Sequence, residues 1–230
     1  MKGEKGKTMP KIPKTQDLFD IRHSVAEVLL DECEYPYEVL TKTEEYIREC
    51  IPMLNHSFKE IATDVYAAED AVIWPGATII GPAIIGHKAE LRPGAFIRGK
   101  VIIGDGALIG NSTEVKNSII LDEARLPHYN YVGDSIIGFR AHMGAGAIAS
   151  NLRLDKKNVS ISCEGEKVDT RLKKIGVFLG DYAEIGCGCV ICPGTVIGRE
   201  AIVYPMTTVR GTVGEREIYK GRPSRENNNG

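Results

Sequence analysis

Two of the five histidines lie in one short stretch, LPHYNYVGDSIIGFRAHMGAG, at residues 126–146. His128 stands near its start, and His142 stands just before the glycines at its end. Because an imidazole titrates close to neutral pH, it can take a proton from a reacting group and act as a general base. The two histidines are therefore the first candidates for chemistry, and the elements around them decide how they are positioned.

A six-residue repeat surrounds this stretch. The position four residues after each aliphatic residue of the repeat is mostly small, and the whole pattern returns after an interruption, at residues 179–213. The first aliphatic series is Ile73, Ile79, Ile85, Leu91, Ile97, Ile103, Ile109, Val115 and Leu121, and the second is Leu179, Ile185, Ile191, Ile197, Val203 and Val209.

A period of six fits neither an amphipathic helix nor a simple alternating strand. It is typical of a coil with three flat sides, in which aliphatic residues fill the interior and small residues and glycines allow tight corners. Three hexads make one coil, and coils stack about 4.8 Å apart. We therefore predict an all-β, parallel β-helix. The repeat resembles that of the hexapeptide acyltransferases, which implies left-handed winding, against the usual right-handed rule.

The composition narrows the class of protein. The chain has 230 residues, 43% of them hydrophobic, and its 29 basic and 31 acidic residues give a net charge of −2. This balance predicts a globular protein without a nucleic-acid partner. The basic start lacks the apolar core of a secretory signal, and no run of 18 apolar residues occurs, so we expect no membrane association and a cytoplasmic location.

The six cysteines favour a reduced, intracellular chain. Three of them lie in CGCVIC, a pattern that suggests metal binding, but Cys189 takes a small-residue position of the repeat, which favours a structural role. A zinc site built from His87, His128 and His142 is also weighed. Their separations of 41 and 14 residues are not multiples of 18, so we predict no metal.

The flanking segments predict the domain boundaries. Residues 15–66 lack the hexad, and TQDLFDIRHSVAEVLLDE and TKTEEYIRECIPML have helical patterns. We therefore expect residues 1–66 to form a small helical appendage that packs on the first coil and covers its open end. The β-helix is expected over residues 67–214, with an insertion at 151–174 that suggests a β-hairpin, and residues 215–230 are expected to form a polar tail.

The hexad slips within the stretch that holds the histidines. Six and twelve residues after Leu121 stand Pro127 and Gly133, and the aliphatic series resumes only at Ile137, a shift of two residues. Because His128 lies inside this shift, we expect the interior ladder to be broken and the backbone to bulge around it.

Several motifs follow one another in a family-specific order: RPGAFI, IGNSTEVKNSII, PHYNYVGDSIIG, MGAGAIASNLRLD and CVICPGTVIG. Residues 85–215 resemble the acetyltransferase half of the bifunctional glucosamine-1-phosphate acetyltransferase/N-acetylglucosamine-1-phosphate uridyltransferase family. NLRLD and VDTRLKKIG resemble its archaeal-type sugar-nucleotidyltransferase relatives. The nucleotidyltransferase half is not expected, since 66 residues are too few for it and no G-x-G-T-R-M loop occurs.

The resemblance implies roles for individual residues. His128 matches the catalytic base, which takes a proton from the amino group of the sugar, and Tyr131 lies in the same motif. Glu114 and Lys116 match the substrate-binding E-V-K motif. Asn151 matches the asparagine after the glycine-rich turn, and Lys157 matches the lysine beyond it, with Lys156 as a rival.

The arginine that binds phosphate is left open. Arg92 matches the family arginine by its R-P-G motif, but one extra hexad separates that motif from Lys116 here. Arg98 precedes Lys116 by 18 residues, one coil, and so occupies the same face. A guanidinium suits a phosphate because it can donate two parallel hydrogen bonds.

The acetyl donor implied by the resemblance is acetyl-CoA, with no metal required. Gly144, Ala145 and Gly146 match the turn that stabilises the oxyanion. Cys187 replaces a family serine of the acetyl-CoA region, and Pro205, one coil further on, is also expected to bind acetyl-CoA. His142 replaces a family asparagine that helps to hold the substrate and the acetyl group.

Two readings of function result. The first is an acetyl-CoA-dependent N-acetyltransferase that acts on an amino-sugar phosphate such as glucosamine 1-phosphate, as a homotrimer with sites between subunits. The second is a non-catalytic trimeric β-helix that binds a sugar nucleotide or partners a separate nucleotidyltransferase. Retention of His128, Lys116 and Tyr131 favours the enzyme, whereas His142 and the missing half favour the module.

Overall fold

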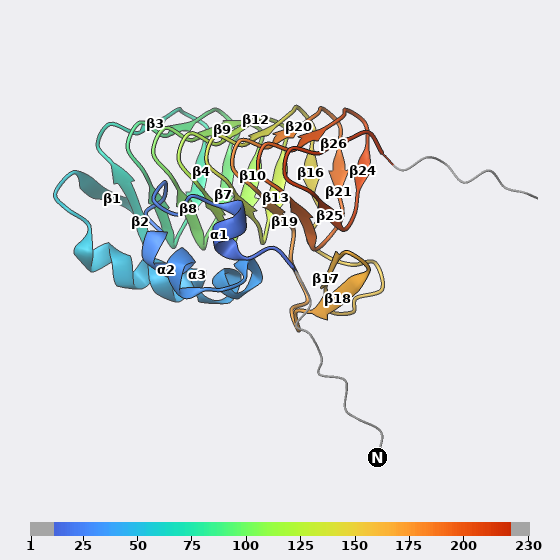
Figure 1. Cartoon of the computed structure of the whole chain (residues 1–230). Coiled ribbons are helices and arrows are strands. Elements are labelled where there is room, and N and C mark those ends of the chain that lie inside the picture. The colour runs from blue at the N-terminus through green and yellow to red at the C-terminus, as the bar shows by residue number, and fades with distance from the viewer. Residues whose placement is uncertain (1–11, 222–230) are drawn as a thin grey trace, which may run out of the picture.

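The computed structural model describes residues 12–221, in which three sheets of mainly parallel strands form the sides of a three-sided coil (Figure 1). The coil is the parallel β-helix that the hexad predicted, with the left-handed winding that the resemblance implied. The nine-stranded sheet runs β1 (Phe58–Ala62), β2 (Val65–Ala68), β5 (Ala83–Ile85), β8 (Val101–Ile103), β11 (Ser118–Ile120), β14 (Ile136–Ile137), β19 (Val177–Leu179), β22 (Thr195–Ile197) and β25 (Thr212–Val213).

The other two sides of the coil are an eight-stranded and a seven-stranded sheet. The eight-stranded sheet runs β3 (Val72–Ile73), β6 (Glu90–Leu91), β9 (Leu108–Asn111), β12 (Arg125–His128), β15 (His142–Met143), β20 (Glu184–Ile185), β23 (Ile202–Val203) and β26 (Ile218–Tyr219). The seven-stranded sheet runs β4 (Thr78–Ile80), β7 (Phe96–Arg98), β10 (Glu114–Lys116), β13 (Tyr131–Gly133), β16 (Ile148–Ala149), β21 (Val190–Ile191) and β24 (Thr208–Val209).

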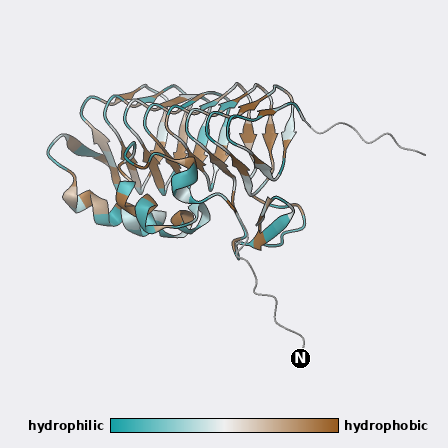
Figure 2. Ribbon diagram, in the orientation of Figure 1, coloured by the Kyte–Doolittle hydropathy of each residue, from teal (hydrophilic) through white to brown (hydrophobic). Residues whose placement is uncertain are grey.

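The interior of the coil is the hydrophobic core that the repeat predicts. Inward-facing apolar residues from the three sheets and small residues at the corners form one continuous buried cluster. Figure 2 shows hydrophobic residues concentrated along the strands of the coil. Cys189 lies inside, fully buried, and its Sγ is 3.1 Å from the carbonyl oxygen of Tyr204, so the structural role predicted for this cysteine fits its position.

The slip in the hexad lies elsewhere than predicted. Val115, Ile120, Leu126, Val132, Ile137 and Met143 form the interior series, so the steps of five residues fall between β10 and β11 and between β13 and β14. Asn117 and Asp134 turn these two shortened corners with φ angles of 44° and 50°. Strands β12 and β9 keep one register from Arg125 to His128, so the predicted bulge at this histidine is wrong.

The N-terminal helices cover a side of the coil rather than its end. They are α1 (Thr15–Leu18), α2 (Glu27–Glu32), α3 (Pro36–Cys50) and the 3-10 helix η1 (Ile51–Met53). Their apolar residues pack with Ile84, Ile102, Ile119, Ile136 and Phe178, which point outward from the nine-stranded sheet. Because this sheet carries apolar residues on both of its faces, its outer face must be covered along its whole length. The predicted cap over the open end is therefore wrong, and β1 pairs with the edge of β2 there instead.

The boundaries also differ from the prediction. Strands β1 and β2 begin before residue 67, and β26 lies beyond residue 214. A turn at residues 19–26 separates α1 from α2, so the first helical segment is not continuous. The polar end of the chain from residue 222 lies outside the described residues.

The insertion forms the predicted hairpin. Strands β17 (Ser160–Cys163) and β18 (Glu166–Asp169) pair antiparallel and project from the coil beside the last turns (Figure 1). Ile161 and Val159 are buried against the same cluster as the helices. Among residues 12–221, no helix is long and apolar enough to cross a lipid bilayer.

Candidate functional site

His128 lies at a corner of the coil between the eight-stranded and seven-stranded sheets, in a column with three other predicted residues. Backbone hydrogen bonds fix the column: Gly146 N–H donates to His128 O (3.0 Å), Gly188 N–H donates to Ala145 O (2.9 Å), and Met206 N–H donates to Cys187 O (2.8 Å). We call His128, Ala145, Cys187 and Pro205 the corner column. Its members stand on successive coils, so the predicted base and the predicted acetyl-CoA residues lie along one line.

A buried amide holds His128 in place. Asn130 is 2% exposed, and its Oδ1 accepts a hydrogen bond from His128 N–H (3.1 Å). Its Nδ2 donates to Gly144 O (2.9 Å) and Ala147 O (3.2 Å) on the next coil. The side chain of His128 is exposed, so the imidazole is available to a substrate while its backbone is fixed. Asn130 thus joins the histidine to the glycine-rich turn.

The glycine-rich turn has one backbone donor without an acceptor within residues 12–221. Gly144 N–H donates to Ile185 O (2.7 Å), and Gly146 N–H donates to His128 O. The N–H of Ala145, between them, makes no such bond. Of the three residues predicted for the oxyanion, Ala145 is therefore the one whose backbone N–H is free to donate.

The predicted phosphate-binding residues gather on the seven-stranded sheet. Arg98 donates to Glu114 through Nη1 at 2.5 Å, and the register of β7 and β10 places Arg98 next to Lys116. Lys116 Nζ lies 3.6 Å from Asp134 Oδ2. Tyr131 follows on the neighbouring strand, in register with Glu114. Two cations and a phenol thus share one outward face.

Asp134 is the centre of this cluster. Its side chain is 8% exposed, and the carboxylate accepts hydrogen bonds from Asn117 Nδ2 (2.7 Å) and Asn151 Nδ2. Burial raises the pKa of Tyr131, and the carboxylate of Glu114 adds to the effect, whereas a hydrogen bond with Asn151 opposes it. Tyr131 therefore stays a neutral hydrogen-bond donor at physiological pH.

Three predicted residues lie outside these groups. Arg92 is on the eight-stranded sheet, where Nε donates to Glu90 at 3.1 Å. His142 is on the same sheet, with Nδ1 2.8 Å from Glu184 Oε2. Lys157 is exposed on the insertion, beside Asp155. The clustering therefore favours Arg98 over Arg92 as the partner of Lys116.

Reasoning from the sequence missed three contributors: Asn130, Asp134 and Glu184. The first two stand inside the motif PHYNYVGD, so the motif gave a signal for them, although it did not reveal that they hold the histidine and the lysine. Glu184 reaches His142 across the inserted hairpin, 42 residues further on, and no local pattern marks it.

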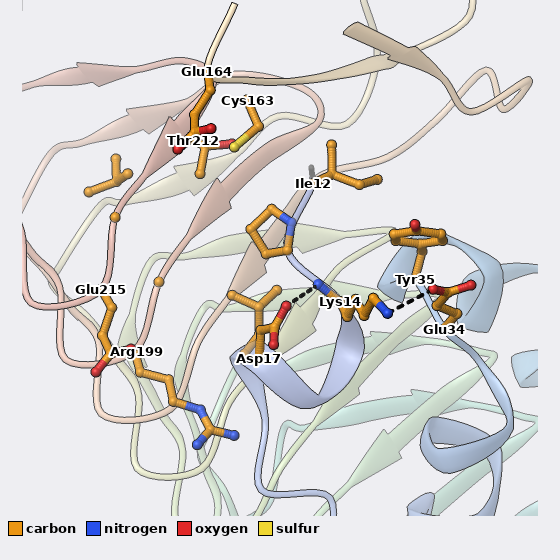
Figure 3. Close-up of a pocket in the computed structure, with 15 residues that line it drawn as sticks. Ile12, Lys14, Asp17, Glu34, Tyr35, Cys163, Glu164, Arg199, Thr212 and Glu215 are labelled. Carbon is orange, nitrogen blue, oxygen red and sulfur yellow. Dashed lines mark hydrogen bonds and ion pairs between the residues drawn. The ribbon is translucent and has the colours of Figure 1, made fainter. Parts of the chain in front are cut away.

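A separate cavity of about 560 Å³ lies where the segment before α1, the hairpin and the last coils meet (Figure 3). Lys14 pairs with Glu34 at 3.0 Å at its edge. None of the predicted site residues lines this cavity.

Comparisons with known proteins match this domain. The family model described as the GMPPB C-terminal domain matches residues 79–173. The bifunctional protein GlmU of Methanococcus maripaludis is 33% identical over 172 residues, which are 74% of this chain and 42% of that protein. A bifunctional sugar-1-phosphate nucleotidylyltransferase/acetyltransferase of Sulfurisphaera tokodaii is 38% identical over 109 residues, 47% of this chain and 27% of the relative. The chain thus matches less than half the length of these curated relatives.

Among solved structures, a variant of GDP-perosamine N-acetyltransferase from Caulobacter crescentus with CoA and GDP-perosamine shares 18% identity, with a TM-score of 0.30 and coverage of 66% of this chain and 50% of that one. The repeat, the coil and the sequence matches define a hexapeptide-repeat domain of the acetyltransferase class. This chain is homologous to the C-terminal region of the GlmU-type bifunctional proteins over most of its length.

Proposed function

We propose that the protein transfers an acetyl group from acetyl-CoA to the amino group of an amino-sugar phosphate such as glucosamine 1-phosphate. The observation that carries the proposal is the corner column: the candidate base His128 stands in line with Ala145, Cys187 and Pro205, the positions expected to contact acetyl-CoA. Tyr131 lies on the same coil as His128, on the strand of the seven-stranded sheet that neighbours the strand of Lys116. The two substrates thus have adjacent candidate surfaces.

The chemistry follows from the groups in reach. A sugar ammonium must lose one proton to water before its nitrogen can attack the thioester carbonyl, and His128 takes a second proton from that nitrogen as it attacks. The attack places negative charge on the carbonyl oxygen, and the N–H of Ala145 stabilises it. The C–S bond then breaks, and the proton passes from the imidazole to the CoA thiolate.

Arg98 and Lys116 bind the phosphate of the sugar in this proposal. Both are held by carboxylates, Glu114 and Asp134, so they are oriented before a substrate arrives. A dianionic phosphate competes with these carboxylates for the cations. Amino sugars without phosphate should therefore bind much more weakly.

The proposal includes a homotrimer. Two of the three sides of the coil carry exposed apolar residues outside the cover of the helices, among them Trp74 (48% exposed) and Ile148 (40%). Leu154 on the insertion is 99% exposed, and Lys157 stands three residues beyond it, apart from its own chain's cluster. In the trimer, the insertion reaches the neighbouring subunit, buries Leu154 and brings Lys157 to that subunit's phosphate.

Release of the CoA thiol tests the substrate class. The purified protein is given acetyl-CoA and, in parallel, glucosamine 1-phosphate, glucosamine or a nucleotide-linked amino sugar. Release with glucosamine 1-phosphate, and at least about tenfold lower kcat/KM with glucosamine, is the expected result, since each lost charged contact is worth about 1.5–3 kcal/mol. Equal rates with and without the phosphate would contradict the assigned role of Arg98 and Lys116.

A further inference from the structure

Three side chains at the other end of the coil form a hydrogen-bonded line. Ser57 Oγ lies 3.1 Å from His87 Nε2, and His87 Nδ1 lies 2.8 Å from Asp70 Oδ1. Ser57 precedes β1, Asp70 follows β2 and His87 follows β5, so the fold brings together three separate segments. A serine, a histidine and an aspartate in this order are the arrangement that activates a serine hydroxyl as a nucleophile.

Each member of the line is fixed by a second contact. His87 N–H donates to Asp105 Oδ1 (2.7 Å), and the ring of Phe58 meets the imidazole edge-on at 5.2 Å. Lys88 N–H donates to Asp70 (3.2 Å), and Ser57 O accepts from Glu69 N–H (2.8 Å). The imidazole, the carboxylate and the backbone of the serine are therefore held in their mutual positions without a ligand.

The protonation states suit a base. Burial acts to raise the pKa of Asp70, but the hydrogen bonds from His87 and from Lys88 N–H outweigh it, so the carboxyl pKa lies below its ordinary value. The ionised Asp70 then accepts the Nδ1 proton of His87. That tautomer leaves the lone pair of Nε2 facing the hydroxyl of Ser57.

This group is separate from the site around His128. Asp70 and His87 lie at the corner between the nine-stranded and eight-stranded sheets, whereas His128 lies at the corner between the eight-stranded and seven-stranded sheets. A reaction at His87 and acetyl transfer at His128 would therefore not depend on each other.

We propose that Ser57, His87 and Asp70 form a second reaction centre, in which Ser57 takes the acyl group of small activated esters. Ser57 Oγ attacks the ester carbonyl carbon while its proton passes to His87 Nε2. The C–O bond to the leaving group breaks, and the proton leaves with that oxygen. Water, deprotonated by the same imidazole, then cleaves the acyl-serine, which releases the carboxylic acid and restores the hydroxyl.

Exposure sets the substrate class. The side chains of His87 and Asp70 are 36% and 44% exposed, so the centre is open and accepts small esters without an enclosing pocket. Asn55 Oδ1 also lies within hydrogen-bond reach of Ser57 Oγ and competes with His87 for the hydroxyl proton. Activated aryl esters therefore react, because an aryloxide leaves without being protonated first, whereas amides do not react.

The test is covalent labelling and ester hydrolysis by the full chain. A fluorophosphonate is added, and peptide mass spectrometry follows the rate of modification at each serine, while release of 4-nitrophenolate from 4-nitrophenyl acetate follows turnover. We expect Ser57 to be labelled first, and Ser57→Ala to lose the label. His87→Gln should slow labelling at Ser57 by about a hundredfold, the scale of losing a general base, and Asp70→Asn should slow it less.

His56→Gln is the matched control, because it changes the exposed neighbour of Ser57 that is outside the line of three. It should leave the labelling rate unchanged, as should His128→Ala, which removes only the acetyl-transfer base. Thermal unfolding shows whether each variant is folded. Labelling of Ser57 no faster than of other serines, or an unchanged rate in a folded His87→Gln, would overturn the proposal.

Discussion

Lys116 Nζ lies 3.6 Å from the carboxylate of Asp134, on the side of the coil that also carries Arg98 and Tyr131. The side chain of Lys116 is 24% exposed and that of Asp134 is 8% exposed. A buried carboxylate needs partners, and Asn117, Asn151 and Lys116 supply them. The lysine is thus held by a group that the fold has already fixed, with its ammonium still open to a second anion.

Lys116→Met should raise the KM for the sugar phosphate at least about tenfold while kcat changes little, because the proposed function assigns the lysine to the phosphate and not to the reacting amine. Steady-state kinetics of CoA release measure both constants. Lys42→Met is the matched control, since this exposed lysine lies on α3. A fall in kcat with an unchanged KM would show that Lys116 acts on the chemical step instead.

The two candidate arginines give opposite expectations. Arg98→Ala should weaken binding of the phosphate substrate about tenfold or more, since it is the neighbour of Lys116 in register. Arg92→Ala should change it less than twofold, because Arg92 lies on another side with Glu90. Calorimetric titration with the sugar phosphate compares the two variants. A larger loss in Arg92→Ala would reverse the assignment.

Asn130→Ala should lower both the stability and the rate. The amide makes three hydrogen bonds inside the coil, and their loss leaves buried backbone groups without partners, which costs about 2–4 kcal/mol. It also removes the link between His128 and the turn at Gly144. Urea unfolding gives the first effect, and kcat at a temperature where the variant is folded gives the second. An unchanged kcat would mean that the backbone of His128 is positioned without Asn130.

Asp181→Asn should destabilise the contact between the N-terminal segment and the coil. Asp181 is 2% exposed and accepts hydrogen bonds from Asp20 N–H (2.6 Å) and Phe139 N–H (2.8 Å). An amide nitrogen in place of one oxygen would face a donor, at a cost of about 2 kcal/mol. Urea unfolding measures this, with the exposed Glu215→Gln as control. Equal midpoints for the two variants would contradict the role given to Asp181.

The coil could be predicted from the sequence because each hexad carries its own signal: one aliphatic residue for the interior and small residues for the corners. The position of the slip in the hexad could not be predicted from the sequence. Leu121 and Ile120 are both apolar and both buried, so the pattern gave no sign that Ile120 points into the coil while Leu121 faces the helices. The shift of two residues was visible, but only the register assigns it to Asn117 and Asp134.

The cover of the nine-stranded sheet was missed for a similar reason. Outward residues such as Ile84, Ile102 and Phe178 are apolar, and adjacent apolar residues on a short strand do not tell which one is covered. For the candidate site, spacing by one coil brought Arg98 to Lys116 correctly. The pairing of His142 with Glu184 depends on which coil follows the hairpin, and this follows only from the fold.

The most direct test of the central proposal compares the protein with His128→Ala in the release of CoA thiol from acetyl-CoA and glucosamine 1-phosphate. We predict release that requires the sugar phosphate and that falls at least about a hundredfold in the variant, the scale of losing a general base. Equal release by the two proteins, or none from a protein shown to be a folded trimer, would contradict the proposal and leave a binding module in its place.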